Sequence, residues 1–117
     1  MQSSAVEEAY QKGFELRHEG KYREAKAFFQ QALTSDPGHW QSKWQLGLIQ
    51  GFEGDFDGSL ESLGNLASQY PHNTQILYDL AMTQMMLGYN DEACANFQRI
   101  LELEPGHENA QRQLKFF

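Results

Sequence analysis

The sequence predicts an all-α fold, an α-solenoid of stacked helical hairpins, because it combines a repeat, helical apolar spacing and regularly placed helix breakers. Its three prolines, Pro37, Pro71 and Pro105, are separated by 34 residues in each step, from 37 to 71 and from 71 to 105. Glycines and small residues follow the same period. A fixed period of this length is typical of repeat proteins, in which each unit buries its apolar face against its neighbours.

The small residues on this period have distinct packing roles. Gly20, Gly54 and Gly88 come where the first helix of each unit should end, a place that favours a left-handed residue. Small side chains along both helices of a unit let the two axes approach to about 8–10 Å. In the first helices these are Gly13, Gly47 and Ala81, and in the second helices Ala25, Ser59 and Ala93.

Apolar residues between the breakers recur with the spacing of an α-helix. In the first unit, Ala9, Gly13 and Leu16 share one face, while Phe29 and Leu33 lie on the facing stripe of the second helix. Each proline ends a second helix because it cannot continue the hydrogen-bond pattern. The predicted helices span about residues 5–19, 22–35, 39–52, 56–69, 73–87, 90–103 and 107–116.

The residues on the period resemble the tetratricopeptide repeat, a family of helix–turn–helix units of about 34 residues. The resemblance implies one domain over residues 1–117, a right-handed superhelix with repeats at about 6–39, 40–73 and 74–107 and a capping helix at about 107–117. It also implies an interaction scaffold and leaves the partner open. The first unit carries the resemblance in Gly13, Gly20, Tyr22, Ala25, Phe29, Ala32 and Pro37.

The second unit departs most from the family pattern. Lys43 stands where the family usually has a large apolar residue. Gly58, Ser59 and Gly64 weaken the second helix of this unit because their helix propensities are low. We therefore expect the middle of the stack to be its softest part.

Charge and cysteine content limit the partners and the compartment. The formal net charge of −7 argues against nucleic-acid backbones and anionic membrane surfaces, which both attract clustered basic residues. No stretch approaches about 18 consecutive apolar residues, and the first residues lack the pattern of a secretory signal. The single cysteine, Cys94, fits a reducing compartment. We expect a cytoplasmic protein that binds neither nucleic acid nor membranes.

The sequence offers little for catalysis or cofactor binding. His39, His72 and His107 fall at the turns between units, about one repeat apart, so we expect turn and capping residues there and no shared zinc site. The carboxylates are scattered, and no nucleophile has a base placed beside it. We expect no enzyme activity, no metal and no cofactor.

One surface suggests a function. In the resembled family the first helices line a concave groove, and here the matching positions are rich in aromatic and methionine side chains. Such a groove suits an amphipathic helix or an extended peptide of a partner protein. The alternative is that these residues pack on one another or on a flanking helix. The predicted groove residues are Tyr10, Phe14, Arg17, Trp44, Leu48, Phe52, Tyr78, Met82, Met85, Met86 and Phe116.

Two further expectations concern partners. Chaperone-binding members of the resembled family grip a terminal carboxylate with Lys and Asn residues. The matching places here are Tyr10, Phe14, Gln45, Gln75 and Asp79, so we expect no affinity for such tails. The second expectation is a possible homo-oligomer, in which the final two phenylalanines of one copy dock on another copy.

Overall fold

The computed structural model describes residues 2–117, and this part of the chain is helical with no β-strand. Every predicted helix is present, and no boundary differs from the prediction by more than three residues. The helices are α1 (Gln2–His18), α2 (Tyr22–Ser35), α3 (Trp40–Phe52), α4 (Phe56–Gln69), α5 (Thr74–Met86), α6 (Asn90–Leu103) and α7 (Glu108–Leu114).

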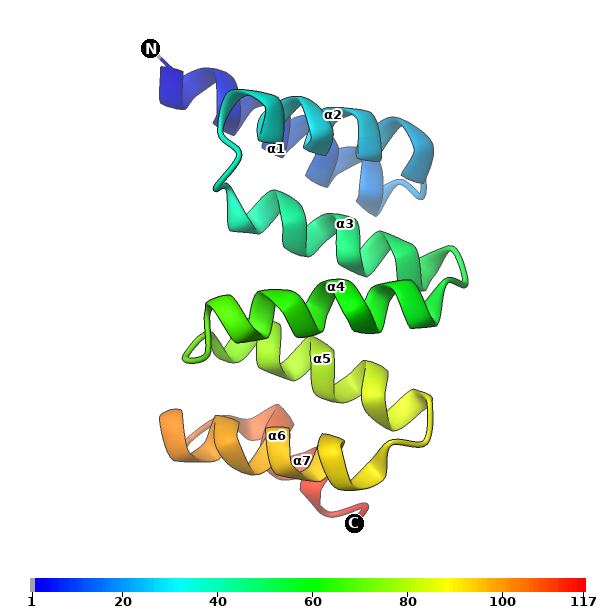
Figure 1. The fold of residues 1–117 in the computed structure, drawn as a ribbon, viewed down its shortest axis with the longest axis vertical. Helices are drawn as coiled ribbons and strands as arrows, with labels where there is room; N and C mark the ends of the chain where they lie inside the picture. The colour runs from blue at the N-terminus through cyan, green and yellow to red at the C-terminus, as the bar shows by residue number, and fades with distance from the viewer. Residues whose placement is uncertain (1) are drawn as a thin grey trace.

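The helices form antiparallel pairs that stack along one axis (Figure 1). The pairs α1–α2, α3–α4 and α5–α6 are followed by α7, which packs on α6. Each pair also contacts the next one, and the resulting body measures 44 × 28 × 22 Å. The two termini therefore lie at opposite ends of the stack. None of the helices described is long and apolar enough to cross a membrane.

Glycine ends the first helix of each pair, as the sequence predicts. Gly20, Gly54 and Gly88 have φ angles of 80°, 93° and 86°, in the left-handed region. The residue after each glycine donates its backbone N–H to a carbonyl five residues earlier, for example Lys21 to Leu16 at 2.9 Å. This is the Schellman arrangement, which satisfies the last free carbonyls of a helix.

The start of each later first helix is capped by a side chain on the same 34-residue period. The Nδ1 atoms of His39 and His107 accept hydrogen bonds from the backbone N–H groups of Ser42 and Ala110. Asn73 fills the equivalent place with its amide oxygen. The prediction that turn histidines serve as caps is confirmed at these two positions.

The core lies between the two helices of each pair and between pairs. Phe29, Leu63 and Phe97, which share one place in the repeat, are fully buried. A Cβ atom added at Gly13 would lie only 2.8 Å from the Phe29 ring, so glycine is needed there for the close approach of α1 and α2. The packing role predicted for this small residue is confirmed.

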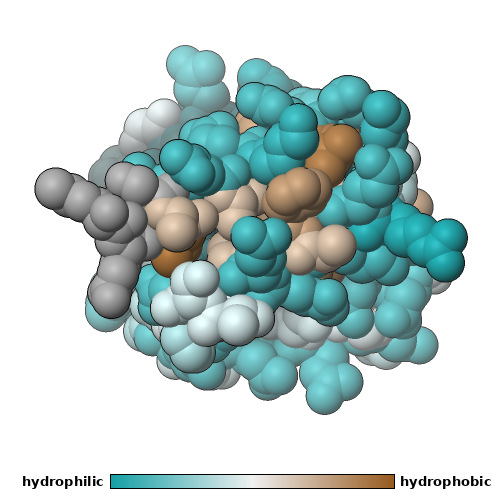
Figure 2. All heavy atoms as spheres, turned by 90° about the horizontal axis from the view of Figure 1, so that it is seen from above, coloured by the Kyte–Doolittle hydropathy of each residue, from teal (hydrophilic) through white to brown (hydrophobic). Residues whose placement is uncertain are grey.

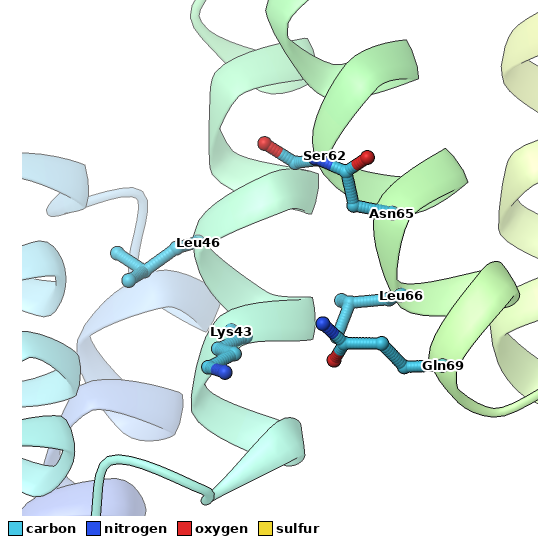
Figure 3. A pocket seen from close by; sticks show the side chains of 6 residues that line it. All are labelled: Lys43, Leu46, Ser62, Asn65, Leu66 and Gln69. Carbon is cyan, nitrogen blue, oxygen red and sulfur yellow. The ribbon is translucent and has the colours of Figure 1, made fainter.

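The middle pair buries most of the polar side chains found in the core of the described residues. Three of the four buried polar residues belong to it, namely Ser42, Gln45 and Ser59. A hollow of about 330 Å³ separates parts of α3 and α4 where Lys43 replaces the usual large apolar residue. Figure 3 shows Leu66 and Gln69 pointing from α4 towards α3 beside this space.

Candidate partner-binding face

The first helices of the three pairs lie next to one another. Helix α1 contacts α3, and α3 contacts α5, so side chains from all three can form one continuous surface. We call the predicted groove residues of these three helices the first-helix face. They are Tyr10, Phe14, Arg17, Trp44, Leu48, Phe52, Tyr78, Met82, Met85 and Met86. The hollows of about 330 and 320 Å³ are lined by residues outside this face.

The helices of this face are joined by two hydrogen bonds between residues 35 positions apart. Trp44 on α3 donates from its indole Nε1 to the Oδ2 atom of Asp79 on α5, at 2.7 Å. Gln45 on α3 donates from Nε2 to the hydroxyl of Tyr10 on α1, at 3.3 Å. The buried Oε1 atom of Gln45 has no hydrogen-bond partner within the described part of the chain. Polar contacts thus fix the spacing of the first helices.

Tyr10 and Tyr78 occupy equivalent places and have a structural role. Each ring packs against the capping histidine of the next turn, Tyr10 on His39 and Tyr78 on His107, with ring centroids 5.3 and 5.6 Å apart. The rings also contact the buried phenylalanines of their own pairs. For these two residues, packing within the stack accounts for the aromatic side chain.

A cluster of aromatic rings surrounds Arg17 at the end of α1. Its guanidinium carbon lies 5.3 Å from the ring centroid of Phe14 and 5.6 Å from that of Phe52, within the range of cation–π contacts. Phe52 also stacks on Tyr22 at 5.7 Å. The buried Nε atom of Arg17 has no partner among the described residues. This cluster joins α1, α2 and α3 at one border of the face.

The most exposed apolar side chains of the face lie at the ends of α3 and α5. Phe52 is 52% exposed and Met86 is 62% exposed. Leu48 and Met82 are half-buried at equivalent places on the same two helices, and Met85 packs partly against the third pair's core. The face therefore combines packed side chains with apolar area that remains open to solvent.

Phe116 does not extend this face as a helical residue. Helix α7 ends at Leu114, and the backbone N–H of Phe116 bonds the carbonyl of Gln113 in a turn. The prediction that the final helix continues to residue 116 is therefore wrong, because the last residues form a turn. Phe116 is 75% exposed, whereas the ring of Phe117 lies 6.1 Å from Phe97.

Asp79 has a contact that the sequence did not predict. From the sequence it is only a position where the charge is wrong for a carboxylate clamp, whereas in the structure it accepts a hydrogen bond from Trp44. Its pKa is raised above the ordinary value because burial removes water from the carboxylate, although the Trp44 hydrogen bond and the Arg17 charge both act to lower it. The sequence contains no signal for this contact, because the two residues are 35 positions apart and a period of 34 compares only equivalent positions.

Residues 2–117 contain neither a cluster of side chains suited to a metal ion nor the basic side chains of a carboxylate clamp at the expected positions. No three side chains of His, Cys, Asp and Glu gather there as a metal would need. At the clamp positions, Gln45 is only 1% exposed and is engaged with Tyr10, and Asp79 carries the charge opposite to the one required. The absence of affinity for acidic tails stays a prediction.

Comparisons with known proteins agree on the family. Two profiles of the tetratricopeptide repeat match the chain, at residues 9–39 and at residues 53–115. Among curated proteins, the Anaphase-promoting complex subunit 7 of Arabidopsis thaliana is 26% identical over 70 residues, which cover 60% of this chain and 12% of that protein. The chain thus spans only a small part of that relative's length.

Solved structures share the fold at low sequence identity. The first repeat domain of Spaghetti (RPAP3), bound to an HSP90 peptide, has a TM-score of 0.85 at 20% identity, covering 97% of this chain and 90% of that one. MamA from Desulfovibrio magneticus RS-1 has a TM-score of 0.79 at 21% identity, covering 95% and 63%. An O-GlcNAc transferase mutant of Thermobaculum terrenum has a TM-score of 0.85 at 18% identity, covering 97% and 22%.

One profile covers more than half of the chain, and the stacked pairs, the glycine turns and the buried phenylalanines repeat with the period of the family. The chain belongs to the tetratricopeptide-repeat family.

Proposed function

We propose that this chain is a non-enzymatic interaction scaffold whose first-helix face binds an amphipathic helix or an extended peptide of a partner protein. The observation that carries this proposal is the open apolar area of Phe52 and Met86 beside half-buried Leu48 and Met82. Exposed apolar area on a folded domain is costly unless a partner covers it. Methionine suits such a surface because its flexible side chain adapts to different partners.

The fold neighbour bound to an HSP90 peptide supports peptide binding as the general mode. The chemistry proposed here differs from capture of an acidic tail, since the matching places lack the basic residues for it. In this proposal, apolar side chains of α3 and α5 hold the partner segment instead of basic residues. We therefore propose partner segments that are recognised by side chains along their length.

A displayed library of amphipathic helical peptides tests the proposal directly. Selection on the intact chain should yield binders, and the variant carrying Phe52→Gln and Met86→Gln should lose about tenfold or more in affinity for them. Both side chains are exposed, so the substitutions remove apolar contact area from the surface. Because Phe52 also packs on Tyr22 and Arg17, the single variant Met86→Gln is measured alongside and should weaken binding on its own.

Tyr89→Ala serves as the matched control. Tyr89 is 48% exposed at the start of α6, outside the first-helix face, so its loss should leave affinity unchanged. The unfolding curve of each variant shows whether folding is intact. A selection that yields no binder, or binders weakened equally by the control, would refute the proposed function.

Self-assembly is the second candidate. Phe116 and Phe117 expose apolar area at the C-terminal end of the stack. At the opposite end, the view along the long axis shows a mainly hydrophilic surface with hydrophobic side chains gathered near its centre (Figure 2). Head-to-tail contact would join these ends. Light scattering over a concentration series should then show growing particles, and a constant monomer mass would rule this candidate out.

A further inference from the structure

We propose that the first-helix face selects amphipathic partner segments with a Lys or Arg side chain among their apolar residues, and that Asp79 binds this cation. The inference rests on the proposed function and adds the chemistry of the partner. It assigns Asp79 as a specificity-determining residue and Trp44 as the hydrogen-bond donor that positions its carboxylate.

The surroundings of Asp79 leave its charge without a close cation. Trp44 donates to one carboxylate oxygen, and no other side chain of residues 5–117 forms a hydrogen bond or an ion pair with this carboxylate, since Thr83 bonds only the backbone carbonyl of Asp79. Arg17 acts on Asp79 only through its more distant charge, because its guanidinium group is held by the rings of Phe14 and Phe52. An incoming ammonium or guanidinium group would supply the missing ion pair.

The charge of the neighbouring helices favours a basic partner. Asp79 is the only charged residue of α5, and Lys43, the only charged residue of α3, lines the hollow towards α4. The α3–α5 half of the face is thus apolar around one negative charge. The net charge of −7 would also draw a basic segment towards the chain over longer distances.

The indole beside the carboxylate holds it in place. Its Nε1 donates to Oδ2 of Asp79 at 2.7 Å, so one carboxylate oxygen is fixed by Trp44. The second oxygen, Oδ1, can accept from a basic side chain. Leu48 and Met82, one helical turn further along α3 and α5, can contact the apolar neighbours of that side chain.

A role limited to joining α3 and α5 would not require a carboxylate. The amide oxygen of asparagine could accept the same hydrogen bond from Trp44 without a buried charge. Burial raises the pKa of Asp79, which means that the ionised form is held at a cost in stability. A costly charge at an interaction surface is the pattern of a residue that serves binding.

The experiment uses the displayed helical library with one position at the centre of the apolar face varied over all residue types. Selection on the intact chain should enrich Lys and Arg at that position, and selection on Asp79→Asn should not. For a selected Lys peptide, Asp79→Asn should lower affinity about tenfold or more. For the same peptide with norleucine in place of Lys, the two proteins should bind alike.

The outcomes separate this inference from the proposed function. Binders with no enrichment of basic residues, or a Lys peptide that binds Asp79→Asn as tightly as the native chain, would overturn the inference while peptide binding stands. A selection that yields no binders at all would refute both. Circular dichroism of Asp79→Asn, expected to match that of the native chain, excludes unfolding as the cause of lost affinity.

Discussion

The indole Nε1 of Trp44 lies 2.7 Å from Oδ2 of Asp79, and this bond links the first helices of the second and third repeats. It lies on the surface formed by the first helices, where the side chains of α3 and α5 are otherwise apolar or neutral apart from Lys43. The pair therefore has two consequences. It holds adjacent repeats in register, and it keeps one ionised group within an apolar surface.

Trp44→Phe should destabilise the fold by about 1–3 kcal/mol, because the carboxylate loses its hydrogen-bond donor while remaining partly buried. The loss also removes an influence that lowers the pKa of Asp79, so that pKa should rise further. Urea unfolding and carboxylate titration by NMR measure the two effects. Trp40→Phe is the control, since it changes a neighbouring indole whose ring lies 5.9 Å away. An equal rise in the Asp79 pKa in both variants would contradict the role of the bond.

Asp79→Asn should stabilise the chain at neutral pH and lose this advantage in acid. The pKa of Asp79 is raised above 3.8, so the folded chain holds this proton more tightly than the unfolded chain. The stabilisation by the protonated group is fully present below about 3.8 and is lost as the pH rises through the raised pKa. Thermal unfolding at neutral and acidic pH tests this. If the native chain were more stable than Asp79→Asn at neutral pH, the predicted direction of the stability change would be wrong.

Gly13→Ala should destabilise the first repeat even though alanine favours helix. The new Cβ would lie 2.8 Å from the ring of Phe29, and such overpacking costs about 1–3 kcal/mol, more than the roughly 1 kcal/mol gained in propensity. Gly64→Ala is the matched control, since nothing lies within 4 Å of its added Cβ. This variant should be stabilised by about 0.5–1 kcal/mol. Denaturant unfolding of both variants decides, and a stabilised Gly13→Ala would disprove the close packing.

The central amides of α4 should exchange with solvent faster than those of α2 and α6. Helix α4 contains Gly58 and Gly64 and borders the hollow beside Lys43, so its local opening should cost less free energy. Native-state hydrogen exchange measured by NMR gives these opening energies residue by residue. If the slowest amides of the chain lay in α4, the expectation of a soft middle repeat would be wrong.

Most of the fold was predictable because each repeat marks its boundaries with residues of special backbone chemistry. Gly20 and its equivalents end first helices in a left-handed turn, and Pro37 and its equivalents follow second helices. The C-terminal end was predicted less well. Helix α7 is two residues shorter than expected at its end, because the backbone N–H groups of Phe116 and Phe117 bond the carbonyls of Gln113 and Leu114 in a turn.

The aromatic column along the first helices was predictable from the repeat, but its polar contacts were not. The repeat period places Tyr10, Trp44 and Tyr78 in one column, yet their roles differ. The two tyrosines pack on capping histidines, whereas Trp44 bonds to Asp79. A period of 34 compares equivalent positions, so it cannot reveal a contact between residues 35 apart on neighbouring helices. That contact depends on how the side chains lean between repeats.

Methyl NMR of the methionines tests the central claim most directly. Three of the four methionines, Met82, Met85 and Met86, belong to the first-helix face on α5, and the exposed methyl group of Ala95 on α6 provides a reference outside it. On titration with a selected helical peptide, the three α5 methyl signals should shift and saturate together, while the Ala95 signal stays in place. Binding that leaves those three signals unchanged would show that the partner segment docks elsewhere.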